Sequence, residues 1–302
     1  MKISPAGRSS LISFKPKHRV FILADITNEP DDAESFCRYL TYANQFETVG
    51  VVAVTSTWLH DLVAPYKLRD IVGAYEKVVE NLNTHAHPDS PYPSVKSISD
   101  VTRSGPPVYG IAAVGDDIPL SEGGELLLEC LTSADTSPLW VLVWGGVNVL
   151  AHQWPDIFYI CSVHGWNQYS NATWIGISGS VDEGGPDPSK VTKDWVREKI
   201  QIGPLGAMYP TPEYIIEGDI PTFLYILQNG LNIPEEPSYG SWGGRYVPLN
   251  ISDKGISNRG HFCDTADTVV GSTGESSPPI KRPSGDGGTP TKMILKRECC
   301  GP

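Results

Sequence analysis

The chain has 302 residues, of which 40% are hydrophobic, and its formal net charge at pH 7 is -12. This length is enough for one large α/β domain with a sizeable core. The negative charge argues against nucleic acid or an anionic membrane surface as a partner, because both would repel the chain at long range. No apolar run approaches the roughly 18 residues that a membrane span requires.

The two ends of the sequence differ in composition from its centre. Residues 1–17 contain basic residues but no apolar segment typical of a secretory signal. We therefore expect a disordered arm and a cytoplasmic location, or secretion if a leader has been lost. Residues 272–302 are rich in Gly, Pro, Ser and Thr, which predicts disorder. The six cysteines show no metal-binding spacing, so a reducing compartment is expected.

In the first half of the predicted domain, which spans residues 18–271, apolar runs of strand length alternate with helical periodicity. Segments 19–24 and 49–54 are typical of strands buried on both faces. One helix is expected from the end of an acidic loop to about residue 44, and a second over 68–82. Residues 85–107, rich in Pro and Ser, predict a long surface loop. This alternation indicates a parallel sheet with right-handed crossovers.

The second half continues the pattern. Ser121 is expected to cap a helix, and 139–144 is the strongest strand pattern of the chain. Pro221 and Gly230 mark the start and the stop of a further helix over 222–229. Shorter strands are expected at 157–161 and 173–177. Together these elements predict an α/β fold, with a mostly parallel central sheet and helices on both faces.

Four acidic residues lie within the eight positions that follow the first predicted strand, namely Asp25, Glu29, Asp31 and Asp32. In open α/β sheets, ligands bind at the carboxyl ends of the strands, where this loop must lie. Close carboxylates repel one another unless a cation or hydrogen-bond donors offset their charge. Calcium is a hard cation that takes oxygen ligands, and it can activate a bound water. The alternative is that Asp31 and Asp32 only cap the following helix and favour its dipole.

The acidic loop and the strand before it resemble the calcium-binding motif of the inosine–uridine-type nucleoside hydrolases. They resemble still more closely the nucleoside-hydrolase-like domain of the cellulose-binding Sde182-type family of fungi and bacteria. Further motifs continue the similarity in order over roughly residues 18–271: Thr55-Ser56-Thr57-Trp58, Ala113-Val114-Gly115-Asp116-Asp117, Ser121-Glu122-Gly123, Trp144-Gly145-Gly146-Val147-Asn148, Ala172-Thr173-Trp174-Ile175-Gly176-Ile177-Ser178-Gly179 and Glu217-Gly218-Asp219-Ile220-Pro221. The resemblance implies a Rossmann-like, nucleoside-hydrolase-like architecture.

The resemblance also implies a function and a set of roles. It implies a calcium-dependent hydrolase in which water attacks an N-glycosidic or other glycosidic bond of a nucleoside, glycoside or carbohydrate. Asp25 would bind the ion and serve as general base, and Asp32 would chelate the ion with Asp31 nearby. A backbone carbonyl at Val147 and the late carboxylate of Asp219 would complete the calcium site.

Other interpretations of these residues remain open. Asp219 also fits the N-cap of the helix that begins near Pro221, and one residue can do both. Trp58 and Trp174 can stack on sugar rings, although Trp174 also fits a core position. Glu29 also fits a solvated loop. The complete set of candidate substrate contacts is Glu29, Trp58, Glu122, Asn148, Trp174 and Glu217.

The sequence departs from the nucleoside hydrolase pattern in three places. The spacing from Asp25 to Asp31 is longer than in that family. Residues 55–58 replace the asparagine that would hold a ribose, and Gly218 stands where some hydrolases have a histidine. The apparatus that activates water is therefore predicted, whereas assistance to the leaving group is not.

The connection after the strand at 139–144 is unusually short. Only twelve residues separate Trp144 from Ile157, which barely accommodates a crossover. We therefore expect a missing segment near residues 152–153, a frame-shifted tail at 272–302, and impaired activity. The alternatives to a hydrolase are a non-catalytic cellulose- or carbohydrate-binding protein that keeps the calcium loop for structure, and an inactive truncated paralogue.

Overall fold

The computed structural model describes residues 16–115, 117–135, 137–151, 159–161, 175–176, 181–182, 192–212, 215–234, 239, 241–242, 246–248 and 262–264. The disorder predicted for both termini and the missing segment expected near 152–153 lie outside these residues. Among the helices of the described part, none combines the length and the apolar character that crossing a membrane demands.

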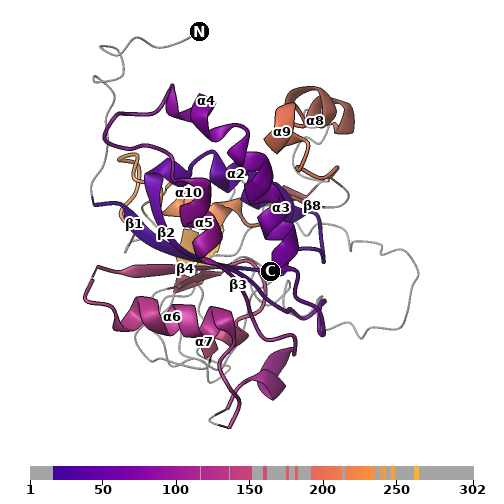
Figure 1. Cartoon of the computed structure of the whole chain (residues 1–302), viewed down its shortest axis with the longest axis vertical. Helices are drawn as coiled ribbons and strands as arrows, with labels where there is room; N and C mark the ends of the chain where they lie inside the picture. Colours follow the sequence, from indigo (N-terminus) through magenta and orange to yellow (C-terminus); the bar gives the residue numbers. More distant parts are fainter. Residues whose placement is uncertain are drawn as a thin grey trace.

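A parallel sheet of six strands forms the centre of the molecule, in the order β3-β2-β1-β4-β5-β6 (Figure 1). Every neighbouring pair in this sheet runs parallel. The chain builds outward from β1 on one side and then crosses to β4 on the other, which creates a switch point at the carboxyl ends of β1 and β4. The strands are β1 (His18–Ala24), β2 (Phe46–Ala53), β3 (Thr102–Ser104), β4 (Leu139–Val143), β5 (Tyr159–Cys161) and β6 (Ile175–Gly176).

Helices cover both faces of this sheet (Figure 1). One face carries α2 (Asp31–Leu40), α3 (Pro65–Glu76), α5 (Val95–Asp100) and α10 (Ile220–Tyr225), and the other carries α6 (Glu122–Thr132) and α7 (Asn148–Ala151). The remaining described elements are α4 (Val79–Asn83), α8 (Lys193–Lys199), α9 (Gly203–Gly206), the 3-10 turns η1 (Ala43–Gln45) and η2 (Gly110–Ala113), and the antiparallel pairs β7 (Val181–Asp182) with β8 (Ile215–Ile216) and β9 (Tyr246–Pro248) with β10 (Phe262–Asp264). The predicted fold class is confirmed.

The central strand β1 is buried on both faces, as its continuous apolar sequence predicts. Val20, Ile22 and Ala24 belong to the hydrophobic core on the α2 side of the sheet. Phe21 and Leu23 belong to the core on the α6 side. Because successive side chains of a strand point to opposite faces, one strand joins both cores. The end of β1 is therefore a rigid place from which to present a side chain.

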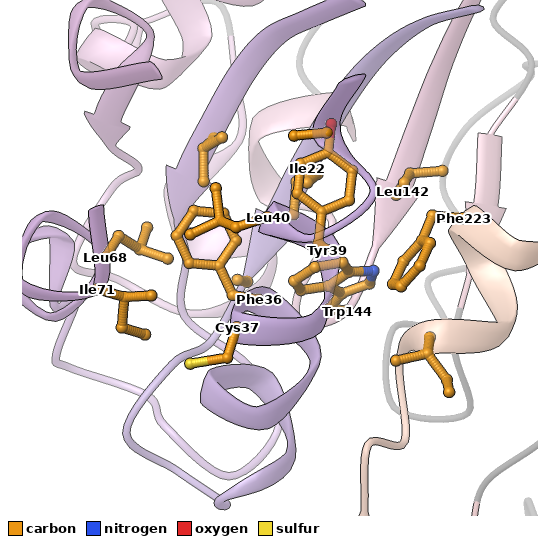
Figure 2. Packing of buried hydrophobic residues seen from close by; sticks show 14 of the residues in the cluster. Ile22, Phe36, Cys37, Tyr39, Leu40, Leu68, Ile71, Leu142, Trp144 and Phe223 are labelled. Carbon is orange, nitrogen blue, oxygen red and sulfur yellow. The ribbon is translucent and has the colours of Figure 1, made fainter. Parts of the chain in front are cut away.

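Aromatic residues hold α2 and α10 to each other and to the sheet (Figure 2). Tyr39 of α2 meets Phe223 of α10 edge to face, with ring centroids 5.5 Å apart. Trp144, directly after β4, is buried and its Nε1 donates to Thr222 Oγ1 at 2.8 Å. Such ring pairs contribute about 0.5–1.5 kcal/mol beyond the area they bury. This packing fixes the start of α10 close to α2.

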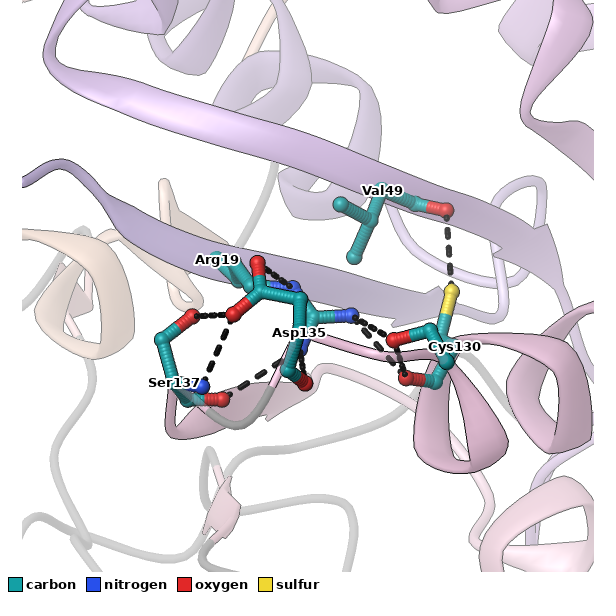
Figure 3. A network of polar contacts seen from close by, with 6 residues as sticks. Arg19, Val49, Cys130, Asp135 and Ser137 are labelled. Carbon is teal, nitrogen blue, oxygen red and sulfur yellow. Dashed lines mark hydrogen bonds and ion pairs between the residues drawn. The ribbon is translucent and has the colours of Figure 1, made fainter.

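A buried arginine holds the amino end of β1 (Figure 3). The Nη2 of Arg19 donates to the carbonyl of Cys130 at 2.9 Å, and its Nη1 donates to the carbonyls of Ser137 at 3.2 Å and Asp135 at 3.3 Å. The Asp135 carboxylate lies 3.5 Å from Nε. One side chain thereby ties the end of α6 and the loop before β4 to the first strand.

Several segments differ from the sequence prediction. The helix expected over 68–82 is divided into α3 and α4, and α2 ends at Leu40 rather than near residue 44. The break between α3 and α4 consists of Lys77 and Val78. The β-branched side chains of Val78 and of Val79, the first residue of α4, lower helix propensity. The surface loop expected at 85–107 contains α5 and the edge strand β3, which pairs with β2. A three-residue strand is too short for its periodicity to be recognised.

Candidate metal centre

Asp25 lies at the switch point of the sheet, where the chain leaves β1 beside the end of β4. The approach of the two segments is close, because a Cβ added to Gly145 would lie 2.7 Å from the Cβ of Asp25 and 2.8 Å from its backbone nitrogen. A Cβ added to Gly146 would lie 2.2 Å from the carbonyl oxygen of Thr55. The two glycines therefore allow the chain after β4 to pack against the ends of β1 and β2.

Three buried carboxylates come together next to this point. Asp31, Asp32 and Asp219 each offer an oxygen, and these oxygens lie within 4.8 Å of one another. The three residues are 1%, 2% and 0% exposed. Asp31 and Asp32 occupy the first turn of α2, whereas Asp219 directly precedes α10. Residues far apart in sequence thus form one acidic cluster.

Helix capping does not account for this cluster. The N-cap positions of α2 and α10 are Pro30 and Asp219, and within the described residues neither helix start donates a backbone hydrogen bond to the side chain of its N-cap. Asp219 occupies a capping position without using its carboxylate as a cap. The charges of Asp31 and Asp32 still favour the dipole of α2.

Burial and mutual repulsion perturb the acids strongly. Burial raises the pKa of Asp25 to about 6, opposed by a hydrogen bond from Ser56. Burial, with repulsion from Glu29 and Asp25, raises the pKa of Asp31 to about 8. Burial, followed by repulsion from Asp25 and Asp219, holds the pKa of Asp32 well above its usual range. The raised pKa values of these three carboxyl groups indicate that the site favours positive charge, either protons or a cation.

The donor set fits a hard cation. Among the described residues, both carboxylate oxygens of Asp31 and Oδ1 of Asp32 lack a hydrogen-bond partner of good geometry. A buried oxygen without a partner costs about 1–3 kcal/mol. A divalent cation would offset that cost, and calcium prefers carboxylate and carbonyl oxygens over nitrogen or sulfur.

Two further residues that were predicted to belong to the site form hydrogen bonds within the protein. The carbonyl of Val147 accepts hydrogen bonds from the nitrogens of Leu150 at 2.9 Å and Ala151 at 2.8 Å, which begin α7. The buried Asn148 donates from Nδ2 to the carbonyls at 108 and 110, at 3.0 and 3.1 Å. Asn148 therefore holds the loop before η2. The metal contact of Val147 and the substrate contact of Asn148 stay predictions.

The other candidate substrate contacts lie in different surroundings. Both carboxylate oxygens of Glu217 accept hydrogen bonds, from Arg38 Nε at 2.6 Å and from the Tyr209 hydroxyl at 2.9 Å. The buried Glu217 is thus engaged inside the protein rather than turned toward a ligand. Glu122 is exposed at the start of α6, and Trp58 is half-buried after β2. Trp174 lies outside the described residues.

A cavity of about 360 Å³ lies beside the acidic loop. Its volume is within the range of small-molecule sites, roughly 300–1,000 Å³. The loop that it borders contains Thr27, whose φ of 98° is unusual for a β-branched residue and costs about 1–3 kcal/mol. The cavity is lined by Ile26, Thr27, Asn28, Glu29 and Pro30 of the loop, Ala33 of α2, Lys67 and Ile71 of α3, and Met208 and Pro210 after α9.

The family model of the cellulose-binding Sde182, nucleoside hydrolase-like domain matches residues 19–153 and 150–246. The chain belongs to this family. The two matched segments of the nucleoside hydrolase-like domain meet at residues 150–153, and the missing segment expected there stays a prediction. No curated protein matches the chain.

A solved structure shares the architecture of this nucleoside hydrolase-like domain. It is that of a nucleoside hydrolase-related hypothetical protein from Saccharophagus degradans, which is described as associated with carbohydrate metabolism. The TM-score is 0.72 at 24% sequence identity, and the match covers 84% of this chain and 68% of that chain. At this identity the likeness shows the fold alone, and it confirms the nucleoside-hydrolase-like architecture.

Two serines of the nucleoside hydrolase-like domain act at the site without having been predicted. Ser56, three residues after β2, is buried, hydrogen-bonds to Asp25 and accepts from the nitrogen of Trp58 at 3.2 Å. Ser35 of α2 accepts from the nitrogen of Asp219 at 3.3 Å. The position of Ser56 at the carboxyl end of a predicted strand could have indicated its role. Nothing in the sequence distinguishes Ser35 from other helical serines.

Proposed function

We propose that this domain is a calcium-dependent hydrolase that cleaves an N-glycosidic or other glycosidic bond with water. The observation that carries the proposal is the convergence of Asp219 with Asp31 and Asp32, next to Asp25. Burying several carboxylates together without a compensating charge is unfavourable, so a fold that gathers them at its switch point requires a reason. A bound calcium ion supplies that reason.

Each side chain has a distinct role in this proposal. Asp31, Asp32 and Asp219 would hold the ion, which when bound would lower the pKa of a water in contact with it. Asp25 accepts the proton of the attacking water as a general base. Burial raises the pKa of Asp25 to about 6 without the ion, and a bound cation would lower this pKa and keep the carboxylate ionised. The water oxygen bonds to the anomeric carbon while the bond from that carbon to the leaving group breaks. Ser56 donates to Asp25 and keeps the carboxylate oriented.

The substrate class that we propose is a carbohydrate or a nucleoside. The family is described as cellulose-binding, and the similar Saccharophagus protein as associated with carbohydrate metabolism. The cavity beside the acidic loop offers hydrogen-bonding groups for hydroxyls from Thr27, Asn28, Glu29 and Lys67. In this proposal these groups bind the sugar, and Asp25 directly precedes the loop that lines the cavity.

A non-catalytic carbohydrate-binding protein is the second candidate. The observation that favours it concerns the leaving group, which needs a proton donor. Glu217 is held by Arg38 and Tyr209, and Glu122 lies exposed on α6; neither of them lines the cavity. Glu29, on the acidic loop itself, is the one candidate substrate contact with a carboxyl group in the described lining. In this case calcium would stabilise the loop that binds the sugar.

Calcium titration by calorimetry, followed by a screen of nucleosides and oligosaccharides, tests the proposal. Asp32→Asn should weaken calcium binding at least about tenfold, since losing even a residue that supports a metal ligand typically costs 10–100-fold. Asp25→Asn should abolish turnover. Asp100→Asn is the matched control, because Asp100 is exposed on α5 and pairs with Lys96; calcium affinity and turnover should not change.

The outcomes separate the candidates. Turnover that requires both calcium and Asp25 supports the hydrolase. Retained binding of cello-oligosaccharides without turnover of any substrate supports the non-catalytic protein. Wild-type protein that binds no calcium at millimolar concentration contradicts the metal centre itself.

A further inference from the structure

Helix α2 does more than supply two carboxylates to the acidic cluster. Its first turn carries Asp31 and Asp32, and residues from Glu34 onward contact the segment that carries Asp219. That segment, residues 217–219, forms the turn between β8 and α10. We name the side chains that join α2 to this turn the turn clamp; they are Glu34, Ser35, Arg38, Tyr209 and Glu217.

The turn clamp makes hydrogen bonds to both the backbone and the side chain of the turn. The carboxylate of Glu34 accepts from the nitrogen of Glu217 at 2.8 Å. Ser35 Oγ accepts from the nitrogen of Asp219 at 3.3 Å. Arg38 Nε donates to Glu217 Oε2 at 2.6 Å. Three hydrogen bonds from side chains of one helix therefore fix the turn relative to the start of that helix.

Glu217 is held in a conformation that needs such support. Its φ is 48°, in the left-handed region, where a residue with a side chain is strained. Glycine would adopt this backbone without strain. Here a glutamate is present instead, and its carboxylate is bound by Arg38 and by the Tyr209 hydroxyl at 2.9 Å. The side-chain contacts thus offset the strain of the backbone.

The charges explain why the turn must be held. Asp219 lies within 4.8 Å of the carboxylate oxygens of Asp31 and Asp32, and like charges at that distance repel. Repulsion would drive the 217–219 turn away from α2 whenever the cluster is ionised. Arg38 opposes this movement, because its guanidinium pairs with Glu217 two residues before Asp219.

We propose that Arg38 and Glu217 are positioning residues, which keep Asp219 within reach of the ion that Asp31 and Asp32 hold. This inference rests on the calcium site proposed above and assigns Glu217 a role other than the substrate contact expected from the sequence. Arg38 and Glu217 act through Asp219 and do not touch the ion. Their loss should change the number of protein oxygens around the ion as well as the affinity.

The decisive experiment compares Arg38→Met with Arg197→Met. The methionine keeps an unbranched apolar stem and removes the guanidinium. Arg197 provides a matched control, since it forms an ion pair with Asp194 at 2.8 Å on the surface of α8. Calcium affinity is measured by calorimetry. Luminescence lifetimes of bound Tb³⁺ in H₂O and D₂O report how many waters contact the ion, which a purely structural role would not change.

Arg38→Met should weaken calcium binding about tenfold and increase the number of waters on Tb³⁺, because Asp219 withdraws. Arg197→Met should change neither. In protein that already carries Asp219→Asn, Arg38→Met should change calcium affinity little further. The effects of two substitutions are not additive when one residue acts through the other. If Arg38→Met does not fold, Arg38→Lys, which keeps the charge, should give a smaller loss in the same direction.

Two results would overturn the inference while leaving the calcium site in place. One is unchanged affinity and hydration in Arg38→Met and Arg38→Lys. The other is an equal loss of affinity with and without Asp219→Asn, which would indicate a general structural effect. Wild-type protein that binds neither Ca²⁺ nor Tb³⁺ would instead remove the metal site and, with it, this inference.

Discussion

At the scale of single residues, Gly145 illustrates how an absent side chain shapes the candidate site. The chain after β4 passes so close to Asp25 that a Cβ at position 145 would also lie 2.9 Å from Asp25 Oδ1. The neighbouring atoms include backbone, which cannot move independently of β1. The position of the proposed general base therefore depends on a glycine in another loop.

Gly145→Ala should destabilise the fold by about 1–3 kcal/mol, because it forces extra atoms into a packed region. It should also weaken calcium binding, since Asp25 must shift. Chemical denaturation and calcium titration of the purified variant measure the two effects. Full calcium affinity in a stably folded Gly145→Ala would show that the close approach does not matter to the site.

Gly73 offers the matched control for this substitution. It lies exposed in α3, and a Cβ added there would meet no atom of the described structure within 4 Å. Gly73→Ala should stabilise the helix by about 0.5–1 kcal/mol and leave calcium affinity unchanged.

The sequence indicated one part of the candidate site and not the other. Asp25, Asp31, Asp32 and Asp219 belong to motifs that a resemblance can recognise, and the structure places them close together. The turn clamp follows no such motif. Arg38 and Glu217 are linked only by the folded arrangement of α2 and the 217–219 turn, and the sequence contains no pattern that pairs them.

At the scale of elements, one end of β1 contributes to the candidate site and the other end contributes to stability. Its carboxyl end presents Asp25, and its amino end is held by Arg19 through the carbonyls at 130, 135 and 137. The seven residues of β1 span roughly 20 Å, so the Arg19 contacts are remote from the acidic cluster. Stability and ion binding can therefore be changed separately.

Arg19→Lys should lower the free energy of unfolding by about 1–3 kcal/mol, because lysine lacks the planar group that reaches several carbonyls at once. Calcium affinity of the folded protein should not change. Arg69→Lys, at an exposed position of α3, is the control and should stay within about 0.5 kcal/mol of wild type. A loss of calcium affinity in Arg19→Lys would show that the two ends of β1 are coupled.

The elements that the sequence predicted well are those with long apolar patterns. β1, β2 and β4 were expected close to their observed bounds, and Ser121 caps α6 by accepting from the nitrogen of Gly124 at 3.1 Å. β3 was missed because its three residues pair with β2 at the edge of the sheet, and that pairing depends on tertiary contacts. Local sequence specifies long buried strands far better than short edge strands.

At the scale of the whole molecule, the acidic cluster links stability to pH and calcium. The pKa values of Asp25, about 6, and Asp31, about 8, are raised from 3.8 in the folded protein. Without calcium, the folded state therefore keeps protons that the unfolded chain releases above about pH 4. Stability should be greatest at the acidic end of this range and fall as pH rises through 6 and 8.

Thermal unfolding in a chelator should accordingly give a lower Tm at pH 8 than at pH 5, with a loss on the order of a few kcal/mol. Calcium should raise Tm more at pH 8, because the ion replaces protons on the carboxylates. Asp31→Asn should flatten the pH dependence of the chelated protein. A metal-free Tm that rises from pH 5 to pH 8 would contradict the raised pKa values.

The sequence separation within the acidic cluster also bears on how the chain is made. Asp25, Asp31 and Asp32 leave the ribosome long before Asp219, since domains emerge from their amino end first. The first sheet strands can assemble while the last carboxylate and its turn are still being translated. Calcium binding by the nascent chain would then mark the completion of the fold, because Asp219 joins the other carboxylates only when α10 packs against α2.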